Sequence, residues 1–301
     1  MYTLDSLDLR APVIPAYGAG VDSTAMIIEM VKRGIPMPCI LFANTGGEKP
    51  PTIAYLETFS DWLEQHGYPR VTEVRYKGNH GRYSTLQGAC EANAVLPSLA
   101  YGGKSCSLKF KAEIQELFLQ GRSRGPNKAP GFEPALEAWK NGLKVVRAIG
   151  YDAGVKDARR EGKSEDDRYV YVYPLREFGM DRLACMESIL AEKLPLPIKS
   201  SCYFCPASKQ GELIWLHAHY PELFMHALLL EEIARPRLTT IEGLWRKSTK
   251  TRPGSWVTWA LQEKLASREA NGTLKLIPHQ GPLPPNPDDE ILRLTALKKA
   301  A

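Results

Sequence analysis

Four of the six cysteines lie in sequence contexts that could ligate a metal. Cys202 and Cys205 form a Cys-x-x-Cys turn within KSSCYFCPASK, and Pro206 follows directly. Two thiolates at this spacing can share one zinc ion or one iron–sulfur cluster. Cys185 lies upstream on an expected helix, and Cys106 lies in the short segment SCS. These positions make Cys106, Cys185, Cys202 and Cys205 the candidate metal ligands.

The residues themselves leave three interpretations of these four cysteines open: an iron–sulfur cluster, a structural zinc ion, or a redox-active or unliganded set of thiols. The other two cysteines have a simpler expected role. Cys39 falls in an apolar strand and Cys90 in an apolar helix, where a small buried side chain is the default. Six cysteines in 301 residues are too few for a disulfide scaffold, which favours a reducing cytoplasm.

A second candidate site is the turn YGAGVDST at residues 17–24, between an expected strand and an expected helix. Its small residues allow backbone N–H groups to close around an anion, and the dipole of the helix N-terminus favours negative charge there. Asp22 adds a carboxylate, while Ser23 and Thr24 add hydroxyls. The lysine of a Walker A loop is absent. The turn therefore predicts phosphate binding, with a helix cap on a tight turn as the alternative.

The elements that would carry these residues follow an alternation of strands and helices. Strands are expected at residues 12–17, 37–44, 71–76, 143–151 and 168–175. Between the first three strands, apolar residues recur at helical spacing, and Gly34 and Gly67 end the expected helices. Such alternation with short connections predicts an α/β fold with a doubly wound, mostly parallel sheet.

The same pattern predicts three regions along the chain. Residues 1–176 are expected to form a nucleotide-binding α/β domain, and residues 177–265 a helical part with the Cys-x-x-Cys metal site. Residues 266–301 contain IPHQGPLPPNPDDE and end in LKKAA, which is typical of an extended or partly disordered tail.

Composition excludes several classes of protein. Lys and Arg total 39 against 34 Asp and Glu, a net charge of +5 that suits an anionic small molecule or a transient nucleic-acid contact. No apolar run approaches the ~18 residues that a membrane span needs. The N-terminus MYTLDSLDLR lacks the features of a secretory signal, so a cytoplasmic protein with no membrane partner is expected.

The turn at residues 17–24 resembles the PP-loop of N-type ATP pyrophosphatases, whose usual pattern S-G-G-x-D-S-[ST] grips the pyrophosphate of ATP. Gly18 and Ala19 stand where that pattern has Ser and Gly. Three further segments are similar to the phosphoadenosine phosphosulfate (PAPS) reductase-like family. In LFANTGGEKPPT, Asn44 replaces the acidic residue of the motif D-T-G-x-x-x-P-E-T, while Thr45 and Gly46 fit.

The other two segments are SCSLKFK at 105–111, similar to C-[TS]-x-x-x-K, and IGYDAGVKDARR at 149–160, similar to G-x-x-x-x-E-x-x-R without its Glu. The order and spacing of these motifs over residues 12–235 resemble the phage and bacterial branch of the family. The resemblance implies an adenine nucleotide alpha hydrolase-like fold. It also implies an enzyme that couples ATP-dependent adenylation to sulfur transfer, and it favours a [4Fe–4S] cluster over Zn²⁺.

The resemblance also implies roles for individual residues. The implied catalytic residues are Asp22, Ser23 and Lys109. The implied nucleotide-binding residues are Tyr17, Gly18, Ala19, Gly20, Val21, Asp22, Ser23, Thr24, Asn44, Thr45, Gly46, Gly150 and Arg160. The adenine nucleotide would be ATP with Mg²⁺, or PAPS or APS as a substrate, and the sulfur acceptor a nucleic acid or a small molecule.

Two alternative functions stay open. One is a sulfonucleotide reductase or hydrolase, although the chain lacks the paired Cys-Cys and the C-terminal nucleophilic cysteine usual in such reductases, since no cysteine follows Cys205. The other is a non-catalytic nucleic-acid-binding module with structural zinc. The sequence leaves the oligomeric state open as well, with a homodimer as one option.

Overall fold

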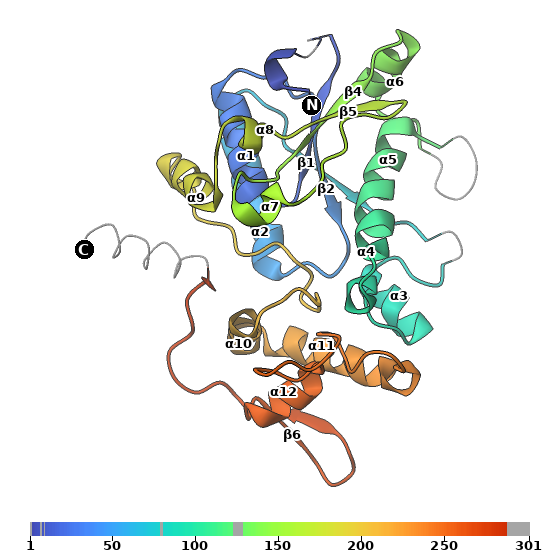
Figure 1. Ribbon diagram of the computed structural model, residues 1–301, viewed down its shortest axis with the longest axis vertical. Coiled ribbons are helices and arrows are strands. Elements are labelled where there is room, and N and C mark those ends of the chain that lie inside the picture. Colours follow the sequence, from blue (N-terminus) through green and yellow to red (C-terminus); the bar gives the residue numbers. More distant parts are fainter. Residues whose placement is uncertain (1, 7, 9, 79–80, 123–128, 288–301) are drawn as a thin grey trace. The chain divides into compact units, whose positions relative to one another are not determined.

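The computed structural model describes residues 2–287, apart from residues 7, 9, 79–80 and 123–128 (Figure 1). The chain forms two compact units, each assembled from several segments. Unit 1 comprises Met1–Asn44, Pro50–Arg75 and Ala112–Ser200, and unit 2 comprises Thr45–Lys49, Tyr76–Lys111 and Ser201–Ala301. These units do not follow the expected ranges 1–176 and 177–265, because two segments of the first range join unit 2 and the start of the second range joins unit 1.

Unit 1 is built on a five-stranded sheet with the order β3-β2-β1-β4-β5, in which all neighbouring strands are parallel. Its strands are β1 (Val13–Tyr17), β2 (Ile40–Asn44), β3 (Val71–Arg75), β4 (Val145–Ile149) and β5 (Tyr169–Val172). The strand order reverses between β1 and β4, so their carboxyl ends lie at the usual position of a ligand crevice in an open α/β sheet. The sheet confirms the predicted α/β fold class.

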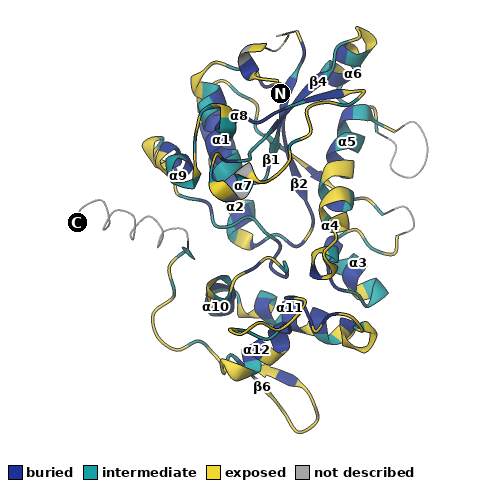
Figure 2. Ribbon diagram, viewed as in Figure 1, coloured by how far each residue is buried: buried dark blue, intermediate teal, exposed yellow. Residues whose placement is uncertain are grey.

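Helices cover both faces of this sheet. The helices of unit 1 are α1 (Val21–Lys32), α2 (Pro50–Gln65), α5 (Glu113–Gln120), α6 (Glu133–Lys140), α7 (Val155–Ala158), α8 (Pro174–Glu177) and α9 (Arg182–Ala191). Helix α1 packs against α8 and α9, whereas α5 packs against α6 and two strands of the sheet. Figure 1 shows α1, α8 and α9 on one side of the strands and α5 and α6 on the other. The buried residues concentrate in the strands and in the helix faces turned toward them (Figure 2).

Unit 2 is mainly helical, as the sequence predicts for the region that contains the Cys-x-x-Cys turn. Its main elements are α3 (Leu86–Asn93), α4 (Ser105–Ser107), α10 (Gln210–His219), α11 (Pro221–Ala234), α12 (Trp256–Gln262), β6 (Ala266–Arg268) and β7 (Leu274–Leu276). Strands β6 and β7 form an antiparallel hairpin within the region expected to be an extended tail. Gly272 allows this hairpin because its φ of 87° suits the tight turn. The part of the predicted tail from residue 288 onward lies outside the described residues.

A buried carboxylate organises the core of unit 2. Glu231 on α11 is 1% exposed, and it accepts hydrogen bonds from the backbone N–H groups of Leu244, Trp256 and Val257 at 2.7, 2.9 and 3.0 Å. The hydroxyl of Ser255 also donates to it. These donors offset the cost of burying the charge and fix the start of α12. Among the described residues, no helix is long and apolar enough to cross a membrane.

Candidate nucleotide and metal sites

The loop between β1 and α1 closes around one hydroxyl group. The backbone N–H groups of Gly18 and Gly20 point at Oγ of Ser23, at 3.1 and 3.4 Å. The Oγ of Thr24 donates to the carbonyl oxygen of Gly20 at 2.8 Å, which holds the loop onto the first turn of the helix. Two backbone donors therefore converge on one oxygen at a helix N-terminus, which is the arrangement that binds a phosphate oxygen.

Small residues allow two other segments of unit 1 to press onto this loop. A Cβ atom at Gly20 would lie 2.7 Å from Oγ of Ser200. A Cβ atom at Gly150, just after β4, would lie 3.1 Å from the backbone N and Cα of Ser23. The predicted nucleotide-binding residue Gly150 is thus brought directly against the loop at residues 18–24. Ser200 carries no sequence signal that would have identified it.

Ala19 adopts the left-handed conformation that the family pattern reserves for glycine. Its φ is 54° and its side chain is fully buried. An L-residue in this conformation costs roughly 1–2 kcal/mol relative to the right-handed form. The loop therefore has a backbone conformation that favours glycine at a position where this chain has Ala.

Three of the predicted nucleotide-binding residues direct their side chains into the core. Tyr17, Val21 and Thr24 are all buried, and the hydroxyls of Tyr17 and Thr24 lie 3.3 Å apart. Burial raises the pKa of Tyr17 well above its usual value. Only the backbones of these three residues can therefore take part in nucleotide binding, while their side chains anchor the loop.

Three carboxylates gather beside the loop. Oxygen atoms of Asp22, Asp152 and Asp157 all lie within 4.8 Å of one another. Arg182 donates to Asp22 at 2.7 Å, and Arg160 approaches Asp157 at 3.1 Å. Burial has the largest effect on the pKa of Asp22 and raises it; Arg182 lowers it, and the two other carboxylates raise it again. Two guanidinium groups face three carboxylates, so the cluster keeps a net negative charge. That charge would favour the binding of a further cation.

Two members of this carboxylate cluster were missed from the sequence. Asp152 and Asp157 lie in the segment IGYDAGVKDARR, where the resemblance stresses a missing Glu. The available signal was that Asp152 lies just after β4 and Asp157 on the short helix α7 that follows, since the carboxyl ends of adjacent parallel strands meet at one edge of the sheet. Asp152 is buried and accepts a hydrogen bond from the backbone N–H of Gly154 at 2.8 Å, which fixes its carboxylate. Arg160, which was predicted, lies at the edge of this cluster with its guanidinium 5.1 Å from the ring of Tyr151.

The second predicted loop, after β2, is divided between the two units. Asn44 ends β2 in unit 1, whereas Thr45 and Gly46 belong to unit 2. Gly46 has a φ of 78°, and a Cβ atom there would lie 2.3 Å from Cγ2 of Thr85. The hydroxyl of Thr45 donates to Glu48 at 2.9 Å and accepts from the N–H of Gly47 at 3.2 Å. The part of the loop from Thr45 to Glu48 is therefore tightly folded within unit 2.

Lys109, the third predicted catalytic residue, lies in unit 2 within an aromatic cluster. Its Nζ donates to the hydroxyl of Tyr83 at 2.8 Å and lies 5.1 Å from the ring centre of Tyr76. The hydrogen bond to Tyr83 raises the pKa of Lys109, so the side chain is held as a cation. The other predicted catalytic residues, Asp22 and Ser23, belong to unit 1.

The four predicted metal ligands are likewise divided. Cys106, Cys202 and Cys205 belong to unit 2, whereas Cys185 lies fully buried on α9 of unit 1. Burial raises the pKa of Cys202 to about 12, so its thiol is protonated at neutral pH without a metal. Among the described residues, no three cysteine sulfurs lie within 4.8 Å of one another.

The chemistry of the donors in unit 2 nevertheless fits a soft metal. Cys202 is buried, while Cys106 and Cys205 are half-buried. One thiol is therefore shielded from water, and the other two can be reached by a metal from solution. The backbone N–H of Cys205 donates to the carbonyl of Cys202 at 3.0 Å, which makes the Cys-x-x-Cys segment a closed turn. Thiols on such a turn suit an iron–sulfur cluster or zinc.

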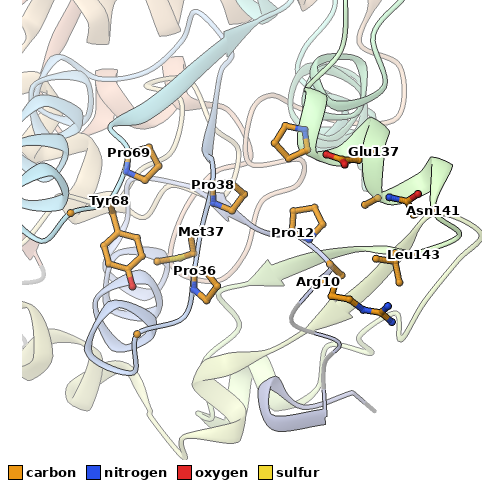
Figure 3. A pocket seen from close by; sticks show the side chains of 15 residues that line it. Arg10, Pro12, Pro36, Met37, Pro38, Tyr68, Pro69, Glu137, Asn141 and Leu143 are labelled. Carbon is orange, nitrogen blue, oxygen red and sulfur yellow. The ribbon is translucent and has the colours of Figure 1, made fainter.

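A large hollow lies elsewhere in unit 1. A pocket of about 940 Å³ is found at the amino ends of the strands, where Pro12, Pro38 and Pro69 precede β1, β2 and β3 (Figure 3). Its charged side chains are Arg10 and Glu137. None of the site residues predicted from the sequence is among those that line it.

No protein-family model and no curated protein sequence matches the chain. Among solved structures, the chain is similar to the U34-tRNA thiolase NcsA from Methanococcus maripaludis with its [4Fe–4S] cluster. The sequence identity is 14% and the TM-score 0.41, over 85% of this chain and 84% of that chain. A similarity of this size identifies neither a family nor a function, which have to be argued from the chain's own residues.

Proposed function

We propose that the chain is a nucleotide-dependent enzyme that binds ATP at the loop of residues 18–24, adenylates a substrate oxygen and releases pyrophosphate. One observation carries the proposal. The two backbone donors of Gly18 and Gly20 converge at a helix N-terminus, and three carboxylates gather beside them at the carboxyl ends of β1 and β4. Anion donors next to a cation-binding cluster are what a magnesium–polyphosphate complex requires.

The loop would bind the pyrophosphate part of ATP. A phosphate oxygen would accept the hydrogen bonds that the N–H groups of Gly18 and Gly20 now give to Ser23, whose hydroxyl would then rotate to donate to the phosphate. Asp22, Asp152 and Asp157 would hold Mg²⁺, which neutralises phosphate charge when bound. Arg160 would supply a fixed cation at the edge of the same cluster.

In the reaction, an oxygen of the substrate would attack the α-phosphorus, the bond to the bridging oxygen would break, and pyrophosphate would leave with that electron pair. The loop N–H groups would stabilise the charge that develops on the leaving group. Lys109 would supply a protonated cation within unit 2, because its hydrogen bond to Tyr83 keeps it charged and oriented. A sulfur nucleophile would then attack the adenylated acceptor, a nucleic acid or a small molecule, and the bond to the adenylate oxygen would break to release AMP.

The cysteines would add the sulfur chemistry. Those predicted from the sequence are Cys106, Cys185, Cys202 and Cys205. A [4Fe–4S] cluster supplies a site for sulfur binding or electron transfer when bound, whereas zinc supplies a structural cross-link. The buried thiol of Cys202 and the half-buried thiols of Cys106 and Cys205 support either occupant.

The test is an incubation of anaerobically purified protein with Mg²⁺ and ATP labelled at the α-phosphate, alongside a parallel incubation with PAPS. We expect binding of ATP and release of pyrophosphate with a labelled adenylate or AMP, and no sulfite from PAPS. Sulfite from PAPS without pyrophosphate from ATP would instead support a sulfonucleotide reductase. A zinc-containing protein that binds DNA or RNA but not ATP would contradict the proposal that the chain is an enzyme.

A further inference from the structure

The Cys-x-x-Cys turn of unit 2 is fastened to the loop Thr45–Lys49. Sγ of Cys202 lies 3.1 Å from Oγ1 of Thr45, and the backbone N–H of Tyr203 donates to the carbonyl of Gly47 at 2.9 Å. A Cβ atom at Gly47 would lie 3.3 Å from Cβ of Cys202, so the two segments are in close backbone contact. The position of the turn relative to this loop is therefore fixed.

Helix α3 is fastened to the same loop and to the same turn. The backbone N–H of Leu86 donates to the carbonyl of Thr45 at 2.9 Å, and the hydroxyl of Tyr203 donates to the side chain of Gln87. Cys90 follows Leu86 by four residues and Gln87 by three, so it lies on the helix face that makes these two contacts. Helix α3 is therefore tied to the Cys-x-x-Cys turn both directly, through Gln87, and through the loop Thr45–Lys49.

The segment after α3 brings Cys106 back toward the same helix. The backbone N–H of Val95 donates to the carbonyl of Cys90 at 3.0 Å, which begins the return, and that of Cys106 donates to Oγ of Ser98 at 2.9 Å. Helix α4, which carries Cys106, also packs against the turn Ser98–Tyr101 that follows α3. Cys106 is therefore held against the segment that leads back from Cys90.

We infer that unit 2 holds a four-thiolate metal site formed by Cys90, Cys106, Cys202 and Cys205. The four residues come from three segments that hydrogen bonds tie together within one compact unit. This inference rests on the metal-binding part of the proposed function and changes its ligand set. The chemical class of occupant is a thiophilic centre, an iron–sulfur cluster or zinc, and each thiol releases its proton on binding.

Cys185 has a different environment. It is fully buried on α9, the helix that packs against α1, and burial followed by the charge of Asp22 raises its pKa. The charged groups that act on its thiol are carboxylates and Arg182, all of them in unit 1. We therefore assign Cys185 to the packing of α9 beneath the carboxylate cluster, and Cys90 takes its place as the fourth ligand.

The experiment compares the anaerobically purified full chain with the variants Cys90→Ala, Cys185→Ala and Cys39→Ala. Iron, acid-labile sulfide, zinc and the visible absorbance of each protein are measured. Cys90→Ala should lose more than half of the bound metal, whereas Cys185→Ala and the matched buried control Cys39→Ala should keep the wild-type content. Thermal melting shows whether each variant is folded. Loss of metal in Cys185→Ala with retention in Cys90→Ala would overturn the inference.

Measurements on the wild-type chain keep the inference testable if Cys90→Ala does not fold. A cluster with four thiolate ligands resists mild oxidation, whereas one with three loses its exposed iron and gives a three-iron spectrum, which would contradict us. For zinc-containing protein, Co²⁺ substitution reports the number of thiolates through its sulfur-to-metal charge-transfer bands. Metal binding without pyrophosphate release would contradict the ATP proposal and still support the four-thiolate site. Pyrophosphate release by a wild-type chain that takes up no iron or zinc would support the ATP proposal and contradict the four-thiolate site.

Discussion

The two ends of the sheet in unit 1 differ in what they offer a ligand. The amino end has a pocket of about 940 Å³ bordered by prolines and a single carboxylate, Glu137 (Figure 3). The carboxyl end has two converging backbone donors and three carboxylates within 4.8 Å of one another. In a parallel sheet, helix N-termini and strand carboxyl ends meet at one edge only. Convergent polar groups, rather than volume, therefore identify the edge that can do chemistry.

The largest difference between the two ends is expected in the rate of pyrophosphate release after one carboxylate is removed. One variant removes a carboxylate at the carboxyl end and a second variant removes one at the amino end. Asp152→Asn keeps an oxygen for the N–H of Gly154 but removes a charge from the cluster at the carboxyl end. We expect pyrophosphate release to fall by about 100-fold or more, as for the loss of one preorganised electrostatic group. The matched control Glu137→Gln at the amino end should leave the rate unchanged. Equal losses in both variants would break the comparison.

A backbone contact gives the next largest effect. A side chain at Gly150 would press on the backbone of Ser23, so Gly150→Ala should displace the start of α1. We expect an increase of about tenfold in the KM for ATP, because small misplacements at a binding site are costly.

Gly67 at the amino end is the control for that variant. It lines the pocket and has open space around it, but its φ is +79°. Gly67→Ala should lower the free energy of unfolding by roughly 1 kcal/mol and leave the KM for ATP unaltered. An unchanged KM in Gly150→Ala would show that the end of β4 is not part of the nucleotide site.

The raised pKa of Asp22 predicts a pH dependence of both activity and stability. Burial raises this pKa, so the ionised carboxylate that Mg²⁺ needs, and with it pyrophosphate release, should appear only as the pH rises through the raised value. The stability of the folded state depends on pH in the opposite direction. Because the unfolded chain loses this proton first, ionisation of Asp22 destabilises the folded state as the pH rises above 3.8, the ordinary pKa of an aspartate.

The variant Asp22→Asn separates these two effects. Without nucleotide, its melting temperature relative to the wild type should increase between pH 4 and pH 7, while its pyrophosphate release is lost. A melting temperature that instead falls progressively over this interval would mean that the ion pair with Arg182 outweighs the cost of burying the charge of Asp22.

The smallest effect is expected for Ala19→Gly. Glycine relieves the left-handed backbone at φ 54° but loses a buried methyl group and adds flexibility to the unfolded chain. These contributions oppose one another, so the free energy of unfolding should change by less than about 1 kcal/mol. Pyrophosphate release should stay within about twofold of the wild type. A large gain in rate would show that Ala19 distorts the loop rather than adopting its functional shape.

Much of unit 1 could be predicted because its signals are local. The five expected strands all form, since apolar periodicity acts over a few positions. The helix after the first strand forms too, but it begins at Val21 with Gly20 as its N-cap, so Asp22 and Ser23 lie in its first turn rather than in the expected turn before it. Asp152 and Asp157 were missed because the motif directs attention to a Glu that the chain lacks. Their relation to Asp22 appears only once β1 and β4 are adjacent.

The organisation of unit 2 could not be predicted in this way. The loop Thr45–Lys49, helix α3 and the Cys-x-x-Cys turn meet through contacts such as that between Thr45 and Cys202, which are 157 residues apart. Cys90 fits an apolar helix equally well as a core residue or as a ligand, and only the rotation of α3 about its axis distinguishes the two roles. The hairpin of β6 and β7 was missed for a related reason, because its two strands of three residues each are too short for a clear alternating pattern.

The interleaving of the two units also sets an order in which the protein can mature. Its six segments alternate between the units, so the chain crosses from one to the other five times. Every segment of unit 1 has been synthesised by Ser200, whereas the partners of Thr45–Lys49 and α3 follow only from Ser201 onward. On the ribosome, the early segments of unit 2 must therefore wait for the last third of the chain. Any metal bound through Cys202 and Cys205 is consequently acquired after the loop of residues 18–24 has had the opportunity to fold.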